Sequence, residues 1–266
     1  MSIEAALVVQ PTSPLRQIWR IFCSNKAALA GLCVLFAVTG IAIIGPWLYQ
    51  FSPNEIVSAP LTPPELEHVF GTDFLGRDVL AGVIHGSRAS LMVGVSAALL
   101  TAVIGVTIGA YSGFYLGRTD DVLMRMTEFF QVLPPLLLAM VVVMLFSATL
   151  TTIAIVIGAV LWVGTARLTR AEYMKLRNLD YVKAERSIGA GDWRIIWAVI
   201  LPNAAPPLIV SSALSVGTAI LFEAGLSFLG LGDPNAMSWG RMIGDNRPYI
   251  LDAWWTVTFP GLAIFV

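Results

Sequence analysis

The chain contains apolar runs long enough to cross a lipid bilayer, and these runs constrain its fold more than any other feature. A membrane-spanning helix needs about 20 predominantly apolar residues. Lipid-facing β-strands would instead alternate apolar and polar residues over about ten positions. We therefore predict an all-α polytopic membrane protein of about six transmembrane helices, with the last helix incomplete in this chain. The predicted spans cover approximately residues 27–49, 90–116, 122–146, 148–168, 204–229 and 254–266.

The composition agrees with this class and excludes several others. Hydrophobic residues make up 57% of the chain and charged residues 12%, against about 45–50% and 25% in soluble domains. The net charge of −1 offers no basic excess for nucleic-acid binding. Cys23 and Cys33 have neither metal-site nor disulfide spacing. The first 26 residues lack the apolar core and cleavage site of a signal peptide, so we expect the first apolar run to remain as an anchor.

Lys and Arg residues are unevenly distributed between the connecting segments, and this predicts the orientation. With the N-terminus in the cytoplasm, twelve of them fall on the cytoplasmic side and four on the external side. We therefore expect a cytoplasmic N-terminal segment, residues 1–26, followed by a transmembrane domain, residues 27–266. Within that domain, the long connections are external segments 50–87 and 230–253 and a cytoplasmic segment 169–198.

The sequence carries no pattern that predicts an enzyme. No glycine is followed by lysine, so the phosphate-binding loop of ATPases is absent and another subunit must hydrolyse any ATP. Residues 230–233 match the Gly-x-Gly-Asp of aspartyl intramembrane proteases, but no second aspartate lies in an apolar run. Ser227 could be a serine nucleophile, yet the histidines, His68 and His85, lie in or beside an external segment. There is no HExxH zinc motif.

Glycines recur every four residues through the end of the second predicted span. Such a ladder lets two helix backbones approach closely. The contact lies either within the protein or at a subunit interface. The glycines are Gly105, Gly109, Gly113 and Gly117.

Two other features inside apolar runs predict packing or a transport pathway. Pro134 and Pro135 each remove a backbone donor, so the third span should be kinked. Glu223 is the only acid well inside an apolar run. Because its charge is costly in lipid, it should face protein or water, either in a structural hydrogen bond or in a pathway.

The cytoplasmic segment has an amphipathic stretch, DYVKAERSIGAGDWRIIWAVILPN, over residues 180–203. Gly189 and Gly191 lower its helix propensity and allow unusual backbone angles. We therefore expect two short helices that meet at a bend. The stretch could lie on the membrane surface or dock onto a partner.

The spacing of this stretch resembles the coupling loop of ABC importer permeases. That loop has Glu-Ala-Ala, three residues, Gly, nine residues, and Ile-x-Leu-Pro. Here Lys183 replaces the glutamate, Glu185 the second alanine and Val199 the isoleucine. The positions that the resemblance assigns to contact with an ATPase subunit are Lys183, Ala184, Glu185, Gly189, Leu201 and Pro202.

Further motifs are similar to the second permease of the dipeptide, oligopeptide and nickel importers. They are FGTDFLGRDVL at 70–80, GLSFLGLG at 225–232 and SWGRMI at 238–243. The resemblance implies a type I ABC importer permease fold with six spans in the bacterial inner (plasma) membrane. It also implies alternating access, with the short helix around 184–189 in a groove of an ATPase subunit.

The resemblance implies the partners as well. They are a homologous second permease, two ATPase (nucleotide-binding) subunits and an external substrate-binding protein. ATP and Mg would be bound on the partner subunits, with no cofactor or metal in this chain. The cargo would be a peptide or a related small solute, because the family serves dipeptides, oligopeptides, nickel, glutathione, opines and some sugars. The alternative is a self-sufficient channel or ion-coupled carrier, for which Glu223 and the Pro134-Pro135 kink are the available midplane features.

Overall fold

The computed structural model describes residues 22–266, and most of the predicted N-terminal segment, with Arg16 and Arg20, lies outside them. In the described residues the only extended pairings are two isolated bridges, Ile56 with Arg77 and Thr72 with Asp78. The prediction of an all-α protein is confirmed. The helices are α2 Lys26–Leu48, α3 Val79–Tyr115, α4 Gly117–Val132, α5 Pro135–Leu145, α6 Leu150–Leu176, α7 Asp180–Ser187, α8 Asp192–Arg194, the π-helical turn η1 Ile195–Ile200, α9 Leu201–Phe228, α10 Trp239–Asn246, the 3₁₀ turn η2 Arg247–Tyr249 and α11 Trp255–Phe265.

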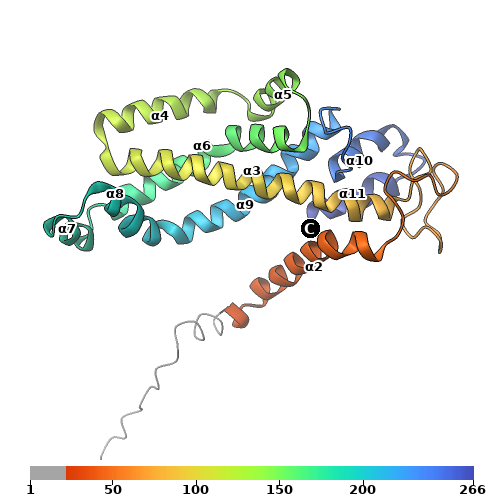
Figure 1. The fold of residues 1–266 in the computed structure, drawn as a ribbon, viewed down its shortest axis with the longest axis horizontal. Helices are drawn as coiled ribbons and strands as arrows, with labels where there is room; N and C mark the ends of the chain where they lie inside the picture. The colour runs from red at the N-terminus through yellow and green to blue at the C-terminus, as the bar shows by residue number, and fades with distance from the viewer. Residues whose placement is uncertain (1–21) are drawn as a thin grey trace, which may run out of the picture.

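Three long helices, α3, α6 and α9, run side by side along the length of the molecule (Figure 1), and α3 and α6 share the most extensive contact. Helices α7 and α8 lie at one end of this bundle. Helix α10 and the irregular segment 50–78 lie at the opposite end. Helix α2 contacts α3 and leaves most of its surface exposed. Of the three long connections predicted from the sequence, segments 50–87 and 230–253 therefore lie at one end of the bundle and segment 169–198 lies at the other.

Four helices are long and apolar enough to cross a membrane, namely α2, α3, α6 and the continuous helix over 192–228. Helices α4 and α5 make a fifth candidate, but they meet at an angle of 85°. The helical region is disfavoured for the residue before a proline, and here Leu133 has ψ of 128° and Pro134 has ψ of 119°. The double proline therefore breaks the span more sharply than the predicted kink.

Helix α3 begins at Val79, well before the predicted start of its span near residue 90. The Asp78 carboxylate caps this helix by accepting the Ala81 amide at 2.8 Å, and the cap sets the start. The polar residues His85, Ser87 and Arg88 lower the hydropathy of the first turns without breaking the helix. Similarly, α6 continues to Leu176, so the connection after it is shorter than the predicted segment 169–198.

The glycine ladder packs α3 against α6. A Cβ atom on Gly105 would lie 2.6 Å from the Cβ of Thr165, and one on Gly109 would lie 2.6 Å from the Cβ of Thr169. Gly113 is equally close to Tyr173 on α6. The ladder therefore serves contact within the protein, and only Gly117, which follows the end of α3, faces open space.

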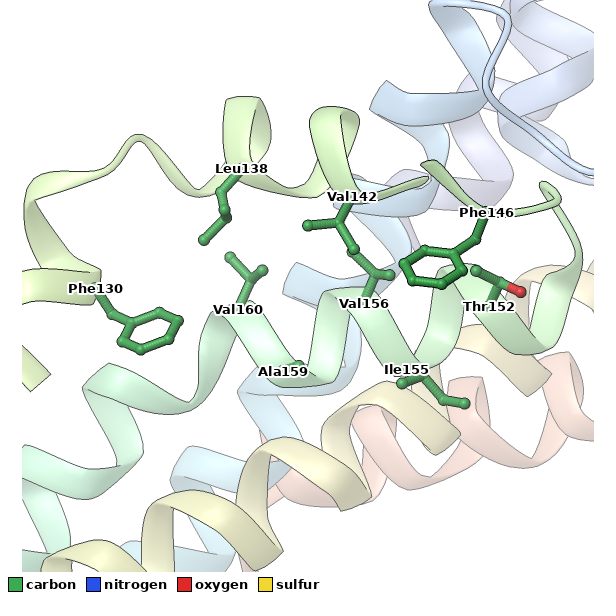
Figure 2. A pocket seen from close by; sticks show the side chains of 9 residues that line it. All are labelled: Phe130, Leu138, Val142, Phe146, Thr152, Ile155, Val156, Ala159 and Val160. Carbon is green, nitrogen blue, oxygen red and sulfur yellow. The ribbon is translucent and has the colours of Figure 1, made fainter. Parts of the chain in front are cut away.

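Helices α4 and α5 lie against α6 around an apolar cavity of about 400 Å³. Figure 2 shows Phe130 from α4 and Leu138 and Val142 from α5 facing the side chains of α6 across this cavity. The hydroxyl of Thr152 is the polar side-chain group that lines it. The cavity therefore offers almost nothing that could recognise a polar molecule.

Candidate functional site

In the stretch with the coupling-loop spacing, residues 180–202, the short helix α7 and the predicted glycine bend are present, but the second helix is not short, because α8 continues through η1 into α9 as one helix over 192–228. We call residues 180–202 the coupling segment. Helix α7 ends at Ser187, and Gly189 follows with φ of +88°. The Ala190 amide returns to the Glu185 carbonyl oxygen at 3.0 Å. Side chains other than glycine rarely adopt this backbone angle, so Gly189 is required for the tight reversal between α7 and α8.

A buried apolar cluster holds the coupling segment against the bundle. Val182 is fully buried and anchors α7. Ile195, Ile196 and Ile200 of η1 are also fully buried, and Tyr173 of α6 packs among them. The Tyr173 hydroxyl donates a hydrogen bond of 3.0 Å to the Ile196 carbonyl oxygen. Helix α7 is therefore packed against the end of the helical bundle.

Two cations join α7 and α6 to the end of α3. The Arg186 guanidinium of α7 lies 5.1 Å from the centre of the Phe114 ring, a cation–π distance. Arg177, after α6, donates through Nη1 to the Phe114 carbonyl oxygen at 2.7 Å. Arg170 of α6 also forms a bidentate ion pair with Asp120 of α4, both bonds being 2.6 Å. These contacts link α7 and α6 to the end of α3, and α6 to α4.

The outer side of the coupling segment presents apolar side chains. Ile188 is 77% exposed and Trp193 is 69% exposed. Exposed apolar residues of this size, gathered on a short turn, are typical of contact with a partner or a membrane. They surround the turn that contains Gly189.

The structure brings some of the predicted contact residues together and separates others. Lys183, Ala184 and Gly189 are exposed. The Lys183 ammonium pairs with Asp180 at 3.0 Å, and Glu185 lies 3.6 Å from Arg194, so the two charged residues that depart from the usual pattern have local partners. Leu201 packs against the buried cluster beneath. Pro202 is exposed in the first turn of α9.

Glu223 lies at the other half of the molecule and is buried in protein, with 1% of its surface exposed. Its Oε1 accepts hydrogen bonds of 2.7 Å from Ser227 of α9 and from Ser238. Ser238 is also the N-cap of α10, since its hydroxyl accepts the Arg241 amide at 3.2 Å. The expectation that Glu223 faces protein is confirmed, and its carboxylate ties α10 to α9.

Glycines let α10 approach α3 and α9 closely. A Cβ on Gly240 would lie 3.0 Å from the Cβ of Ala224, and one on Gly86 would lie 3.2 Å from the Trp239 ring. The Trp239 indole donates to the Val83 carbonyl oxygen at 2.9 Å. The motif at 238–243 therefore builds a helix that packs closely against α3 and α9.

Two side chains, Tyr173 and Arg88, make contacts between helices that were not predicted from the sequence. No sequence pattern pointed to the Tyr173 contact, because Tyr173 is one residue of a largely apolar helix. The Arg88 contact could have been found from Pro46, because a proline at this position of α2 leaves the Ala42 carbonyl oxygen without its helical donor. Arg88 Nε donates to that oxygen at 2.6 Å, and Nη2 donates to the Ile43 carbonyl at 2.9 Å.

Comparison with known families places the chain in a class. The family described as binding-protein-dependent transport system inner membrane component matches residues 105–266. The family described as the N-terminal TM domain of oligopeptide transport permease C matches residues 13–64. The chain belongs to the binding-protein-dependent transport permeases, the multi-pass membrane components of ABC transporters. This family implies partner ATPase subunits and a substrate-binding protein, and its permease subunits are not catalytic.

The relatives place it within the family as a permease of the DppC and OppC type. It is 40% identical to the di/tripeptide transport system permease protein DppC of Pseudomonas aeruginosa, over 96% of this chain and 86% of that protein. It is 41% identical to the dipeptide transport system permease protein DppC of Bacillus subtilis, over 98% and 83%. The oligopeptide transport system permease protein OppC of Bacillus subtilis is 38% identical, over 90% and 79%.

A solved structure shares the fold. A chain from inward-facing conformations of the MetNI methionine ABC transporter superposes with a TM-score of 0.52 at 17% identity. The match covers 69% of this chain and 90% of that one. The fold is therefore similar to that of an ABC importer permease.

Proposed function

We propose that this permease forms half of the pathway of an ATP-driven importer of dipeptides or short oligopeptides. The observation that carries the cargo class is its identity of 38–41% to relatives named as peptide permeases. The other half of the pathway is a homologous second permease. An external binding protein delivers the peptide, and two ATPase subunits bind ATP and Mg and drive alternating access.

In this proposal the coupling segment seats α7 in a groove of an ATPase subunit. The exposed side chains of Ile188 and Trp193 supply the apolar contact, while Lys183, Glu185 and Gly189 shape the turn. Val182 and Arg186 pass the motion to the bundle, because the first is buried in it and the second lies on Phe114. Leu201 and Pro202 support the segment from the start of α9.

The orientation belongs to the same proposal. The coupling segment and the N-terminus face the cytoplasm, and α10 with segment 50–78 faces outward, as the distribution of Lys and Arg favours. Helices α4 and α5 together serve as one span and α11 as part of another, which makes six. Glu223 acts by holding α10 in place, a role that its hydrogen bond to Ser238 supports.

A self-sufficient channel or ion-coupled carrier is the alternative. It would use polar groups or broken helices at the midplane. The bend between α4 and α5 is such a break, but its cavity is lined almost entirely by hydrocarbon. Because the break lacks polar groups that could bind an ion, it is better explained as a packing feature than as a site of ion coupling.

The proposal is tested by copurification and by uptake. The permease is expressed with its partner subunits, and Ile188→Ser is compared with Leu251→Ser, which removes a 95% exposed apolar side chain at the opposite end. We expect Ile188→Ser to weaken ATPase copurification and dipeptide uptake, and Leu251→Ser to leave copurification unchanged. Uptake of dipeptide without any ATPase subunit would support the carrier instead.

The orientation is tested by thiol labelling in intact cells. In a variant without Cys23 and Cys33, a single cysteine is placed at position 188 or at position 251. An impermeant reagent should label only position 251 from outside. Labelling of position 188 alone would invert the orientation and remove the docking proposal.

A further inference from the structure

A second pocket, of about 300 Å³, lies at the end of the bundle where α10 is found, and several polar side chains line it among apolar ones. Its walls come from segment 50–78, α3, the start of α6 and the loop before α10. The polar side chains that line it are Asn54, His85, Arg88 and Asn235. These four polar side chains distinguish the pocket from the cavity of Figure 2, which is lined almost entirely by hydrocarbon.

Arg88 is fixed at this pocket by its contacts with α2. Its Nε and Nη2 donate to the carbonyl oxygens of Ala42 and Ile43, the first of which Pro46 leaves without a helical donor. Its Nη1 makes no hydrogen bond within residues 22–266. The guanidinium therefore has one edge held by backbone and another edge available to a ligand.

The positive charge of Arg88 has no acidic partner in the described part of the chain. No aspartate or glutamate lines the pocket. Asp233 is near, but its carboxylate accepts the Leu150 amide at the start of α6 at 3.0 Å and the Asn235 amide at 2.8 Å. The Asp233 carboxylate therefore caps the N-terminus of α6 and does not pair with Arg88. The helix dipole favours a negative charge at this position.

His85 lies one helical turn before Arg88 on the same face of α3, and both line the pocket. Neither of its ring nitrogens forms a hydrogen bond within residues 22–266. An imidazole offers at least one N–H donor, and an amide side chain offers two. The pocket therefore combines one fixed cation with several donors and no anion.

We infer that this pocket binds the free carboxylate of the peptide cargo on its way into the pathway. The inference rests on the proposed function and deepens it. Arginine binds carboxylates through paired N–H donors, and His85, Asn54 and Asn235 can complete the shell. The ammonium end of the peptide is not bound here, because the pocket has no acidic group to receive it.

A lipid phosphate is the other anion that Arg88 could meet. The pocket favours the cargo, because Asn54 and Asn235 come from the connecting segments and would be poorly placed against acyl chains.

The test uses the complete transporter in proteoliposomes with its binding protein. Uptake of dialanine is compared with uptake of dialanine amide, which lacks the carboxylate. The same binding protein is present in every assay, so its own preference cancels when the acid-to-amide ratios of variant and wild type are compared. The variants are His85→Leu, which leaves the α2 contacts intact, and Arg88→Lys.

We expect His85→Leu and Arg88→Lys each to lower the acid-to-amide ratio, Arg88→Lys by about tenfold, the factor that corresponds to one charge-assisted hydrogen bond. The matched control is Arg247→Lys, an arginine at the same end that donates to the Phe228 carbonyl oxygen, and its ratio should equal that of the wild type. An unchanged ratio in both pocket variants would overturn the inference.

Two further outcomes would contradict the inference in different ways. If His85→Leu and Arg88→Lys reduce uptake of acid and amide equally, and the reduction depends on the anionic lipid content of the vesicles, Arg88 binds a lipid phosphate and the inference is wrong. If the wild-type complex takes up neither compound, the proposed function itself is wrong. The wild-type control therefore distinguishes the two failures.

Discussion

The Tyr173 hydroxyl of α6 and the Ile196 carbonyl oxygen of η1 are joined by a hydrogen bond of 3.0 Å. The same oxygen accepts the Leu201 amide, which closes the π-helical turn. A π-helical turn is rare and is often found at functional sites. The side chain that positions this turn comes from α6, the helix that precedes the coupling segment, so this hydrogen bond links α6 to the helix that continues into α9.

Replacing Tyr173 with Phe should weaken this coupling with little loss of stability. The Ile196 oxygen would keep the Leu201 amide, so the cost is about 1 kcal/mol, the net value of one hydrogen bond. Tyr173→Ala should cost about 3–5 kcal/mol, because it also leaves a cavity. Thermal aggregation of the purified complex measures the loss of stability in each variant. Peptide-stimulated ATP hydrolysis measures the coupling. If Tyr173→Phe left hydrolysis fully coupled and only Tyr173→Ala uncoupled it, packing alone would matter and the hydrogen bond would have no role in coupling.

The turn at Gly189 provides a prediction with an internal control. Gly189 has φ of +88° and Gly191 has φ of −70°, and an added side chain would meet open space at both positions. Gly189→Val should therefore be strained and weaken ATPase copurification, while Gly191→Val should be tolerated. Gly189→Asn should recover part of the function, because asparagine tolerates positive φ better than valine. A fully coupled Gly189→Val complex would refute the docking role.

The membrane-surface alternative predicts a different pattern for the same segment. If the coupling segment lies on lipid, Gly189→Val changes little and polar replacement of Trp193 causes the larger loss. Trp193→Gln, measured by vesicle binding and by ATPase copurification, separates the two. We expect a loss in copurification that does not depend on lipid composition.

Much of the fold could be predicted from the sequence because the bilayer imposes a length on each apolar run. The helix boundaries could not, because they depend on caps and on tertiary contacts. The Asp78 cap extends α3 past polar residues that lower its hydropathy. The angle at Pro134 and Pro135 depends on two successive residues being forced out of the helical region, which the expectation of a simple kink underestimated.

The coupling segment was predictable for a different reason. Its glycines and alternating polar and apolar residues specify a bend locally, and the structure has the turn at Gly189. The contacts that fix the segment to the bundle could not be predicted, because Tyr173 and Phe114 are distant in sequence from Ile196 and Arg186, the residues they contact. The same holds for Ser238, whose bond to Glu223 joins residues in two different elements.

The bond between Glu223 and Ser238 should hold α10 closed against the bundle. Ser227 is the matched control, because it donates to the same Oε1 at the same 2.7 Å but lies on α9 itself. A single cysteine in place of buried Met242 reports opening of α10. Ser238→Ala should cost about 1–2 kcal/mol by losing a hydrogen bond and a helix cap.

That cost should accelerate labelling of the cysteine about 5- to 30-fold, and Ser227→Ala should leave the rate near that of the parent. Glu223→Gln keeps an acceptor and should resemble the parent, whereas Glu223→Leu should resemble Ser238→Ala. Normal transport and higher stability in Glu223→Leu would remove any role for this residue in holding α10.

The contact between α3 and α6 depends on the absence of side chains at the ladder glycines. An added methyl on Gly109 would lie 2.6 Å from the Cβ of Thr169 and 2.9 Å from the backbone nitrogen of Arg170. Backbone cannot move aside as a flexible side chain can, so Gly109→Ala should force the two helices apart. Gly217 in α9 faces open space, and Gly217→Ala adds the same methyl to the same kind of helix without a clash.

Helix propensity alone would make both substitutions stabilising by up to about 1 kcal/mol. We expect that sign only for Gly217→Ala. Gly109→Ala should lower the thermal midpoint of the purified protein and loosen the Asp120–Arg170 ion pair, which bridges α4 and α6 just beyond the ladder. If Gly109→Ala were as stable as Gly217→Ala, the close approach of α3 and α6 would not be needed, and the ladder would have to serve a contact outside this chain.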